Sequence, residues 1–541
     1  MDDESANHGR GGHGVSDLDV RTTGGIVRGA RRRGLVWWRG IPFAAPPVGS
    51  LRFRAPRPAR PWQGVRDAST FGPVAMQSRN GNFIGTSRST PMSEDCLTIN
   101  VLRADRQAAE DATATAPTPA TASADEKLPV MVFIHGGAYS VGSSAEHPQN
   151  GETLVREGGI VYVSFNYRLG ALGYLDFSRY STPERPIDSN LGLRDQVAAL
   201  QWVQQNIAAF GGDPANVTVF GESAGGNAVT TLMAVPSARG LFARAIAQSS
   251  PANAIYLPEM AAIWAEEFAE RLSDSIDTDA VESTSDDSAG ALLVDASAEE
   301  LVDAAVALTL DTPDAHPGTI ALSPVIDGDF LPERPLDAFK EGRAARVPLI
   351  IGTNDREGAL FTGRLDILAT TPKRIRAIFA RTKKKSRKAI KAEYPGLPAQ
   401  RPAADFGGDY AFWYPTVKVA ERHSRYAPVH FYRFDIAPRL VRLAGFDATH
   451  GLDLFAVFDR LDGTFGRFMT ILGGRREFRG AAERMRAHWL AFARDGRLDE
   501  TAWPLYDETD RLTLIIAPVD RIEADPRSTR RQAWQAFVPH V

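Results

Sequence analysis

The feature that most constrains the fold is the stretch 217–226, where an apolar run ends in Gly221, Ser223 and Gly225. Alternating apolar residues at 217–220 predict a buried strand, and the small residues from 224 predict a helix packed closely beneath it. Such a sharp turn strains the serine backbone, and side chains at the glycine positions would clash. The pattern G-x-S-x-G predicts a nucleophile turn, although an ordinary strand–helix connection has the same spacing.

Apolar runs elsewhere predict more strands around this turn. Residues 130–134, 160–167 and 244–248 have the composition of buried strands, and residues 191–207 have helical spacing. Strands that alternate with helices indicate a parallel sheet with right-handed crossovers. The sequence therefore predicts an α/β fold with a large, mostly parallel central sheet and helices on both faces.

Composition narrows the class of partner. A chain of 541 residues with 43% hydrophobic residues can bury a large core, and a net charge of -4 gives no global attraction to nucleic acid or anionic membranes. The single cysteine, Cys96, excludes an intramolecular disulfide. The acidic first residues do not resemble a secretory signal, and no apolar run reaches about 18 residues. We expect a cytoplasmic protein with a small-molecule partner.

Four segments differ from the rest in composition. Residues 1–16 are predicted to form a disordered tail, and residues 104–127 a surface insertion. Residues 274–300 carry nine acidic and no basic residues, which indicates a second, solvated insertion. Residues 373–391 carry ten basic and no acidic residues, and we interpret them as a surface helix in preference to an anion-binding patch.

Several segments, taken in order, resemble the type-B carboxylesterase family of the α/β-hydrolase fold, which includes carboxylesterases, cholinesterases and para-nitrobenzyl esterases. They include residues 40–49, 93–101, 135–139, 221–225 and 503–506, and the resemblance runs from about Gly24 to Tyr506. It implies one domain over residues 17–541, inserted segments that cap a gorge, and no metal or cofactor. Disulfide-bonded relatives pair the cysteine of the segment at 94–97 with another about twenty residues upstream, where this chain has none. Cys96 is therefore predicted to be a free, buried thiol.

The resemblance assigns a base and an acid to the serine. A serine hydroxyl needs a neutral imidazole to accept its proton. Among ten histidines, His450 lies in a loop before an apolar helix, similar to the segment that carries the base in the family. The family places its acid before the glycine that corresponds to Gly358, which indicates Glu357 and leaves Asp355 as the alternative. The chain order Ser223, Glu357, His450 agrees with the fold.

The predicted strand 130–134 ends in residues 135–139, which contain two glycines. The amides of Gly136 and Gly137, with that of Ala224, would form an oxyanion hole similar to that of the family, although an ordinary turn is the alternative. His135 is expected to orient this loop by a hydrogen bond. Four further residues are predicted to support the site or line a substrate pocket: Glu222, Tyr139, Phe412 and Trp413.

These features predict a serine hydrolase that cleaves small to medium hydrophobic esters through an acyl-enzyme, with water as the second substrate. Carbamates, amides and lipids are alternative substrates for the same triad. Because this fold also serves as a non-catalytic interaction module, that class stays open as well. No nucleic acid partner and no stable membrane insertion are expected, and the sequence does not indicate an oligomeric state.

Overall fold

The computed structural model describes residues 16–79, 86–87, 89–105, 127–145, 150–276, 285–363 and 366–537. Three regions of the sequence analysis fall outside these ranges. They are the tail at 1–15, most of the insertion at 104–127, and residues 277–284 of the acidic tract.

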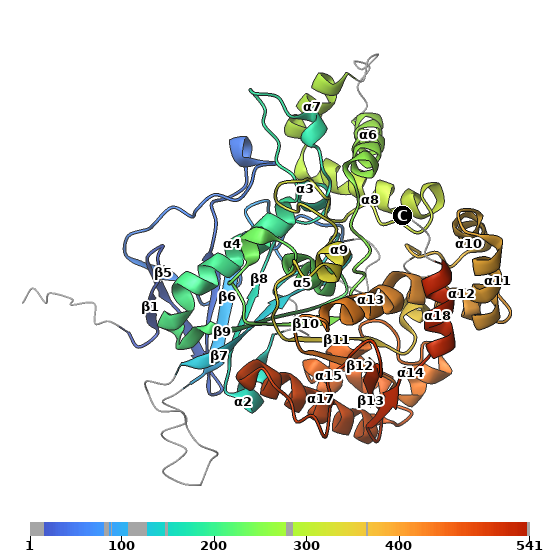
Figure 1. Cartoon of the computed structure of the whole chain (residues 1–541). Coiled ribbons are helices and arrows are strands. Elements are labelled where there is room, and N and C mark those ends of the chain that lie inside the picture. The colour runs from blue at the N-terminus through green and yellow to red at the C-terminus, as the bar shows by residue number, and fades with distance from the viewer. Residues whose placement is uncertain are drawn as a thin grey trace, which may run out of the picture.

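The fold is built on an eleven-stranded sheet (Figure 1). In spatial order its strands are β14 (Arg521–Ala524), β13 (Leu512–Ile516), β12 (Val429–Phe434), β11 (Leu349–Asn354), β10 (Arg244–Gln248), β9 (Gly212–Glu222), β7 (Leu128–Ile134), β8 (Val161–Phe165), β6 (Thr98–Ala104), β4 (Leu35–Pro42) and β3 (Ala30–Arg32). The strands from β13 to β8 run parallel, and antiparallel strands flank them at both edges. The predicted mostly parallel sheet is confirmed.

A second, smaller sheet lies near the N-terminus. It contains β1 (Asp19–Arg21), β2 (Ile26–Arg28) and β5 (Val65–Asp67), with β1 antiparallel to β2. Glycine and proline interrupt this part of the chain, and its strands are therefore short.

The sheet is buried on both faces because alternate side chains of its central strands enter different cores. In β7, Val130 and Val132 belong to one hydrophobic cluster, whereas Met131 and Phe133 belong to the other. The first core includes residues of α4 (Leu191–Asn206), α5 (Ala224–Leu232) and α13 (Tyr414–His423). The second includes residues of α2 (Glu152–Gly158), α15 (Leu452–Val457) and α17 (Arg475–Asp495). Figure 1 shows these two sets of helices on opposite sides of the sheet.

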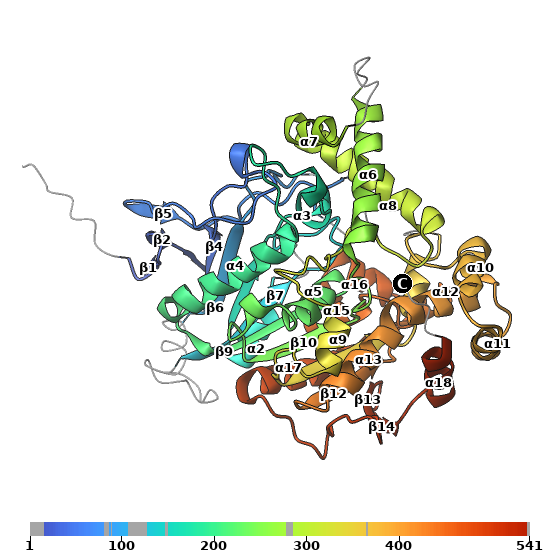
Figure 2. The same cartoon turned by 45° about the horizontal axis from the view of Figure 1, so that its top comes forward.

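Three helices of the inserted region project from the sheet in both views (Figures 1 and 2): α6 (Pro258–Ser275), α7 (Asp286–Asp295) and α8 (Ala298–Ala315). The described part of the acidic tract is largely helical, which the sequence analysis did not predict. Ser285 and Ser297 cap α7 and α8, and acidic residues in each first turn interact favourably with the helix dipole. Leu293 anchors α7 by burying its side chain.

The basic tract is helical, as predicted, but it forms two helices, α10 (Pro372–Ala380) and α11 (Lys384–Glu393). Ile375, Ile378 and Phe379 are buried, while most of the charged side chains face water. α11 packs against the C-terminal helix α18 (Ser528–Phe537). The tract therefore keeps an apolar side on the core and a basic side in solvent.

Cys96 is a free cysteine and is buried, as expected. Burial raises the pKa of its thiol far above the usual range, because the thiolate loses its hydration in the core.

Candidate active site

Ser223 lies between β9 and α5, at the turn that the sequence predicts. Its backbone has φ 59° and ψ −123°, a strained conformation for a residue with a side chain. A Cβ atom at Gly225 would lie 2.1 Å from the carbonyl oxygen of Ile134, which ends β7. Only a glycine fits this close approach of helix to strand. The Ser223 residue remains partly exposed.

Glu357 and His450 meet although they lie 93 positions apart in the chain. Nδ1 of His450 donates a hydrogen bond of 2.6 Å to Oε2 of Glu357, and both side chains are buried. The other carboxylate oxygen of Glu357 accepts a hydrogen bond of 2.7 Å from the Ser249 hydroxyl and one of 2.6 Å from the backbone N–H of Asn354. These contacts fix the carboxylate and, through it, the orientation and tautomer of the imidazole.

The alternative acid, Asp355, faces away from this histidine. Its carboxylate lies 2.6 Å from the Arg527 guanidinium and 3.6 Å from that of Arg433. In a continued strand, residues two positions apart would point to the same side. The chain instead turns at Asp355 and Arg356, and Glu357 begins the 3-10 helix η6 (Glu357–Phe361), so the two acids point in different directions.

The predicted hydrogen bond between Ser223 and His450 is not formed. Nε2 of His450 has no hydrogen-bond partner among the described residues, and it lies 3.2 Å from Oε1 of Glu222, which neighbours the serine. Catalytic hydrogen bonds are often long or misaligned before substrate binds, which accounts for the difference.

Three buried carboxylates surround this imidazole: Glu222, Glu357 and Asp453. Burial lowers the pKa of His450, but Glu222 and Glu357 outweigh burial and raise that pKa above the ordinary imidazole range. Burial also raises the pKa of Glu222. The cluster therefore stabilises a positive charge on the histidine.

Asp453 accepts hydrogen bonds from side chains of three neighbouring strands of the sheet. The donors are the side chains of Gln248 at 2.7 Å, Tyr432 at 2.9 Å and Asn354 at 3.1 Å. Since these residues end or lie within β10, β12 and β11, the contacts tie α15 to the sheet edge that carries Glu357.

The glycine loop after β7 packs against the serine turn. A Cβ atom at Gly136 would lie 2.5 Å from the carbonyl oxygen of Glu222 and 3.3 Å from Cβ of Ser223. Gly137 has φ 111°, a conformation that favours glycine. Among the residues that the structure describes, the amides of Gly136 and Gly137 donate no hydrogen bond. Ala224 begins α5, and the first N–H groups of a helix have no acceptor within it. These donors are free to bind an oxygen atom beside Ser223.

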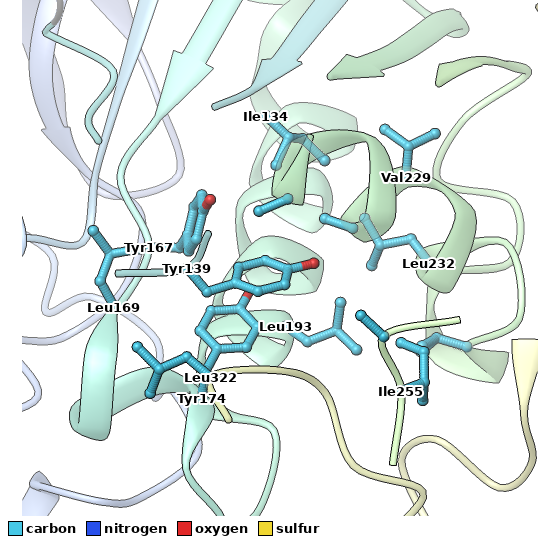
Figure 3. Packing of buried hydrophobic residues seen from close by; sticks show 14 of the residues in the cluster. Ile134, Tyr139, Tyr167, Leu169, Tyr174, Leu193, Val229, Leu232, Ile255 and Leu322 are labelled. Atoms are coloured by element: carbon cyan, nitrogen blue, oxygen red, sulfur yellow. The ribbon is translucent and has the colours of Figure 1, made fainter. Parts of the chain in front are cut away.

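Two buried rings, which Figure 3 shows, and an asparagine hold the glycine loop in place. The Tyr139 hydroxyl donates a 2.7 Å hydrogen bond to Asn227 in α5, and the Tyr139 ring stacks on Tyr174 at 3.8 Å. Tyr139 is 3% exposed, so it supports the loop from below. Asn227 is a residue that the sequence analysis missed; its only signal is an amide side chain among small and apolar residues.

His135 also supports the loop, as the sequence predicts. Its Nδ1 lies 3.0 Å from the Gly136 carbonyl oxygen, and its ring stacks on Tyr167 at 4.3 Å. Burial lowers the pKa of His135 to about 4, which keeps the ring neutral near pH 7.

An apolar cluster lies against the other face of His450. The Phe412 ring lies 4.3 Å and the Phe361 ring 5.1 Å from the imidazole centroid. Leu368 and Ala411 complete the buried part of this cluster. Phe412 and Trp413 belong to one π-helical turn, η7 (Asp409–Trp413), but Trp413 faces the main core and a separate small cavity. Of these two aromatic residues, Phe412 is therefore the one that reaches the site.

The described ranges contain neither a candidate metal site nor a candidate membrane-spanning helix. No group of three histidine, cysteine, aspartate or glutamate side chains there has the geometry to hold a metal ion. No described helix combines the length and the apolar character that crossing a membrane requires.

The sheet topology, with a serine at the β9–α5 turn and a glutamate just after β11, is that of an α/β-hydrolase. The carboxylesterase family model matches residues 16–534, and the chain belongs to the carboxylesterase family.

Relatives and solved structures agree with this placement. The para-nitrobenzyl esterase of Bacillus subtilis (strain 168) is 36% identical over 522 residues, covering 95% of this chain and 97% of that protein. A medium-chain fatty acyl-CoA hydrolase precursor of Anas platyrhynchos is 32% identical, covering 92% and 89%. A solved PNB esterase structure has a TM-score of 0.81 at 35% identity, covering 96% of this chain and 99% of that chain. A Geobacillus stearothermophilus carboxylesterase has a TM-score of 0.78 at 32% identity, covering 96% and 100%.

Proposed function

We propose that this carboxylesterase cleaves small to medium hydrophobic esters, with Ser223 as nucleophile, His450 as base and Glu357 as the acid that orients the base. The 2.6 Å contact between Glu357 and His450 carries the proposal, because it leaves the second imidazole nitrogen available beside the serine turn.

The reaction proceeds in two halves. Ser223 Oγ attacks the ester carbonyl carbon while Nε2 of His450 takes the hydroxyl proton. The tetrahedral intermediate then collapses, the bond to the alcohol oxygen breaks, and the imidazolium returns the proton to the departing alcohol. Water attacks the acyl-enzyme in the same way, so that the acid leaves and Ser223 regains its proton.

The negative oxygen of each tetrahedral intermediate is assigned to the amides of Gly136, Gly137 and Ala224. Their lack of internal acceptors supports this role, since amides aimed at a developing charge require no reorganisation during the reaction. Loss of one such donor typically costs about 3–4 kcal/mol of transition-state stabilisation.

A hydrophobic substrate is favoured by the apolar cluster beside His450. Phe361 and Phe412 stack on each other at 5.5 Å and offer apolar area next to the reacting carbonyl. We assign this cluster to the acyl or alcohol group of the substrate.

The test is hydrolysis of para-nitrophenyl esters of increasing acyl length by the parent protein and by Ser223→Ala. The variant is expected to lose activity by on the order of a thousand-fold or more, while its circular dichroism and melting temperature stay unchanged. An organophosphate should label the parent at Ser223 and leave the variant unlabelled. Activity retained by a folded Ser223→Ala protein would contradict the assignment.

The alternative functions are separated by assaying the same two proteins with carbamates, amides and long-chain lipids matched to these esters. Faster turnover of matched carbamates, amides or long-chain lipids would change the substrate class but keep the triad. Absence of both turnover and labelling in a folded parent protein would favour an interaction module. The cytoplasmic location stays a prediction, which cell fractionation tests.

A further inference from the structure

An exposed apolar surface lies on the short helices that flank the His450 loop. Five large hydrophobic side chains are 48% to 70% exposed there, a high value for side chains of this kind. They come from α14 (Arg439–Leu443), from α16 (Thr464–Met469) and from the two residues that shortly follow α16. The apolar patch consists of Leu443, Phe465, Phe468, Ile471 and Leu472.

Internal contacts make these residues one surface. α14 packs beside α16, and the Arg439 amide donates a 3.3 Å hydrogen bond to the Gly473 carbonyl oxygen. The rings of Phe465 and Phe468 lie 6.5 Å apart. Phe465 also lies 5.6 Å from Phe455 of α15, the helix that begins two residues after His450. The apolar patch is thus continuous with the helix that follows the loop of the candidate base.

Four arginines on the same helices or close to them in the chain form no ion pair with a described residue. Arg439, Arg442, Arg467 and Arg476 are exposed, and none of them forms an ion pair among the described residues. By contrast, Arg475 and Arg479 both contact Asp462 in the same region. The patch therefore combines protruding apolar side chains with four uncompensated positive charges, although the whole chain has a net charge of -4.

We infer that this surface docks the enzyme onto an anionic phospholipid interface. Apolar side chains that enter the acyl boundary, together with arginines at headgroup level, are the two components of peripheral membrane binding. Contiguous exposed apolar surface on a monomer marks an interaction site. The acyl chains of an anionic lipid would cover the apolar side chains, and its headgroups would pair with the arginines. A second copy joined by two-fold symmetry would bring the same arginines face to face.

The inference does not depend on the proposed catalytic residues, and its test is designed accordingly. The full-length Ser223→Ala protein is mixed with sucrose-loaded vesicles of phosphatidylcholine with about 30% phosphatidylserine and sedimented. Binding is measured against vesicles of phosphatidylcholine alone and at raised salt. We expect binding to the anionic vesicles that salt weakens, because the arginine contribution is screened.

Two patch variants isolate the two components. Phe465→Ser with Phe468→Ser removes apolar contact, and Arg442→Gln with Arg467→Gln removes charge. Each pair is expected to weaken vesicle binding by about tenfold or more, since each arginine near an anionic surface contributes on the order of 1 kcal/mol. Hydrolysis of a short, water-soluble ester by the same variants with Ser223 intact should be unchanged, which shows that they are folded.

Matched controls alter equally exposed residues elsewhere. Leu310 on α8 is 65% exposed, and Lys384 and Lys388 lie on the basic face of α11. Leu310→Ser and the lysine-to-glutamine pair should bind vesicles as the parent does. Parent-like binding by both patch variants overturns the inference, as does equal binding to neutral vesicles. Concentration-dependent dimerisation that requires the patch, without vesicle binding, would assign the surface to a second copy instead.

Discussion

At the scale of single residues, the imidazole of His450 lies among Glu222, Glu357 and Asp453, and this arrangement determines how the site responds to pH. The carboxylate of Glu222 lies 3.2 Å from the nitrogen that must accept the serine proton. A negative charge so close stabilises the imidazolium and raises the pKa of the histidine. Activity requires the neutral imidazole, so kcat/KM should fall as pH drops through that pKa.

Glu222→Gln tests this reading. Removal of the charge lowers the pKa of His450, and the neutral base then persists to lower pH. The acid limb of the kcat/KM profile should therefore move to lower pH. It is measured with a neutral ester from about pH 5 to about pH 10, so that the profile extends above the raised pKa of the histidine. Glu477→Gln, on the exposed start of α17, serves as the control and should leave the limb in place. A limb that stays put or moves upward in Glu222→Gln would refute the electrostatic role.

The two acids that follow β11 provide a second residue-scale comparison. Glu357→Gln should lower kcat by on the order of 10⁴-fold. The glutamine oxygen would keep the hydrogen bonds from Ser249 and Asn354, so its NH2 group would face Nδ1 of His450 and favour the wrong tautomer. Asp355→Asn should keep nearly all activity, since its carboxylate contacts Arg527 and Arg433. Steady-state kinetics with thermal melts decides the assignment. The reverse ranking would show that Asp355 is the catalytic acid.

At the scale of elements, close packing of α5 and ordinary packing of α17 place different demands on helical glycines. A Cβ atom at Gly225 in α5 would lie 2.1 Å from the Ile134 carbonyl oxygen, whereas one at Gly480 in α17 would meet only an Arg484 side chain at 3.5 Å. Gly225 therefore permits the close approach of α5 to β7 at the serine turn, whereas no backbone atom lies close to the Cβ position of Gly480.

This contrast predicts opposite effects of the same substitution. Gly480→Ala should stabilise the protein by about 0.5–1 kcal/mol, because alanine has the higher helix propensity. Gly225→Ala should lower the melting temperature and abolish most activity, as α5 must move away from β7. Differential scanning fluorimetry and ester hydrolysis measure both changes. A Gly225→Ala protein with the parent's melting temperature and activity would show that the turn tolerates a wider separation.

At the scale of the whole molecule, one sheet separates two cores, and the residues of each core come from distant parts of the chain. That residues 17–541 form a single domain stays a prediction, which cooperative unfolding would test. Cys96 is a natural probe of it, because its thiol is 1% exposed.

We expect a thiol reagent to label Cys96 only as the whole domain unfolds. Labelling during a urea titration should coincide with the loss of far-UV circular dichroism and of esterase activity, as cooperative unfolding requires. Cys96→Ser provides the unlabelled control. Labelling that precedes the loss of helical signal would show that the N-terminal strands open as a separate unit.

Several central strands, the serine turn and the chain order of the candidate site residues could be predicted from the amino-acid sequence. These features depend on local patterns: alternating apolar residues in β7, glycines at Gly221 and Gly225, and the segment around His450. Each follows from interactions within a few residues or from resemblance to a family, and the structure reproduces the elements closely.

Which side chains lie in contact could be established only from the three-dimensional structure. Four features depend on the relative orientation of distant elements: the choice of Glu357 over Asp355 at the histidine, the contact of Glu222 with Nε2, the support of the glycine loop by Asn227, and the packing of Trp413 into the main core. Local sequence cannot specify such orientations, because packing between the sheet and its helices fixes them through contacts between residues far apart in the chain.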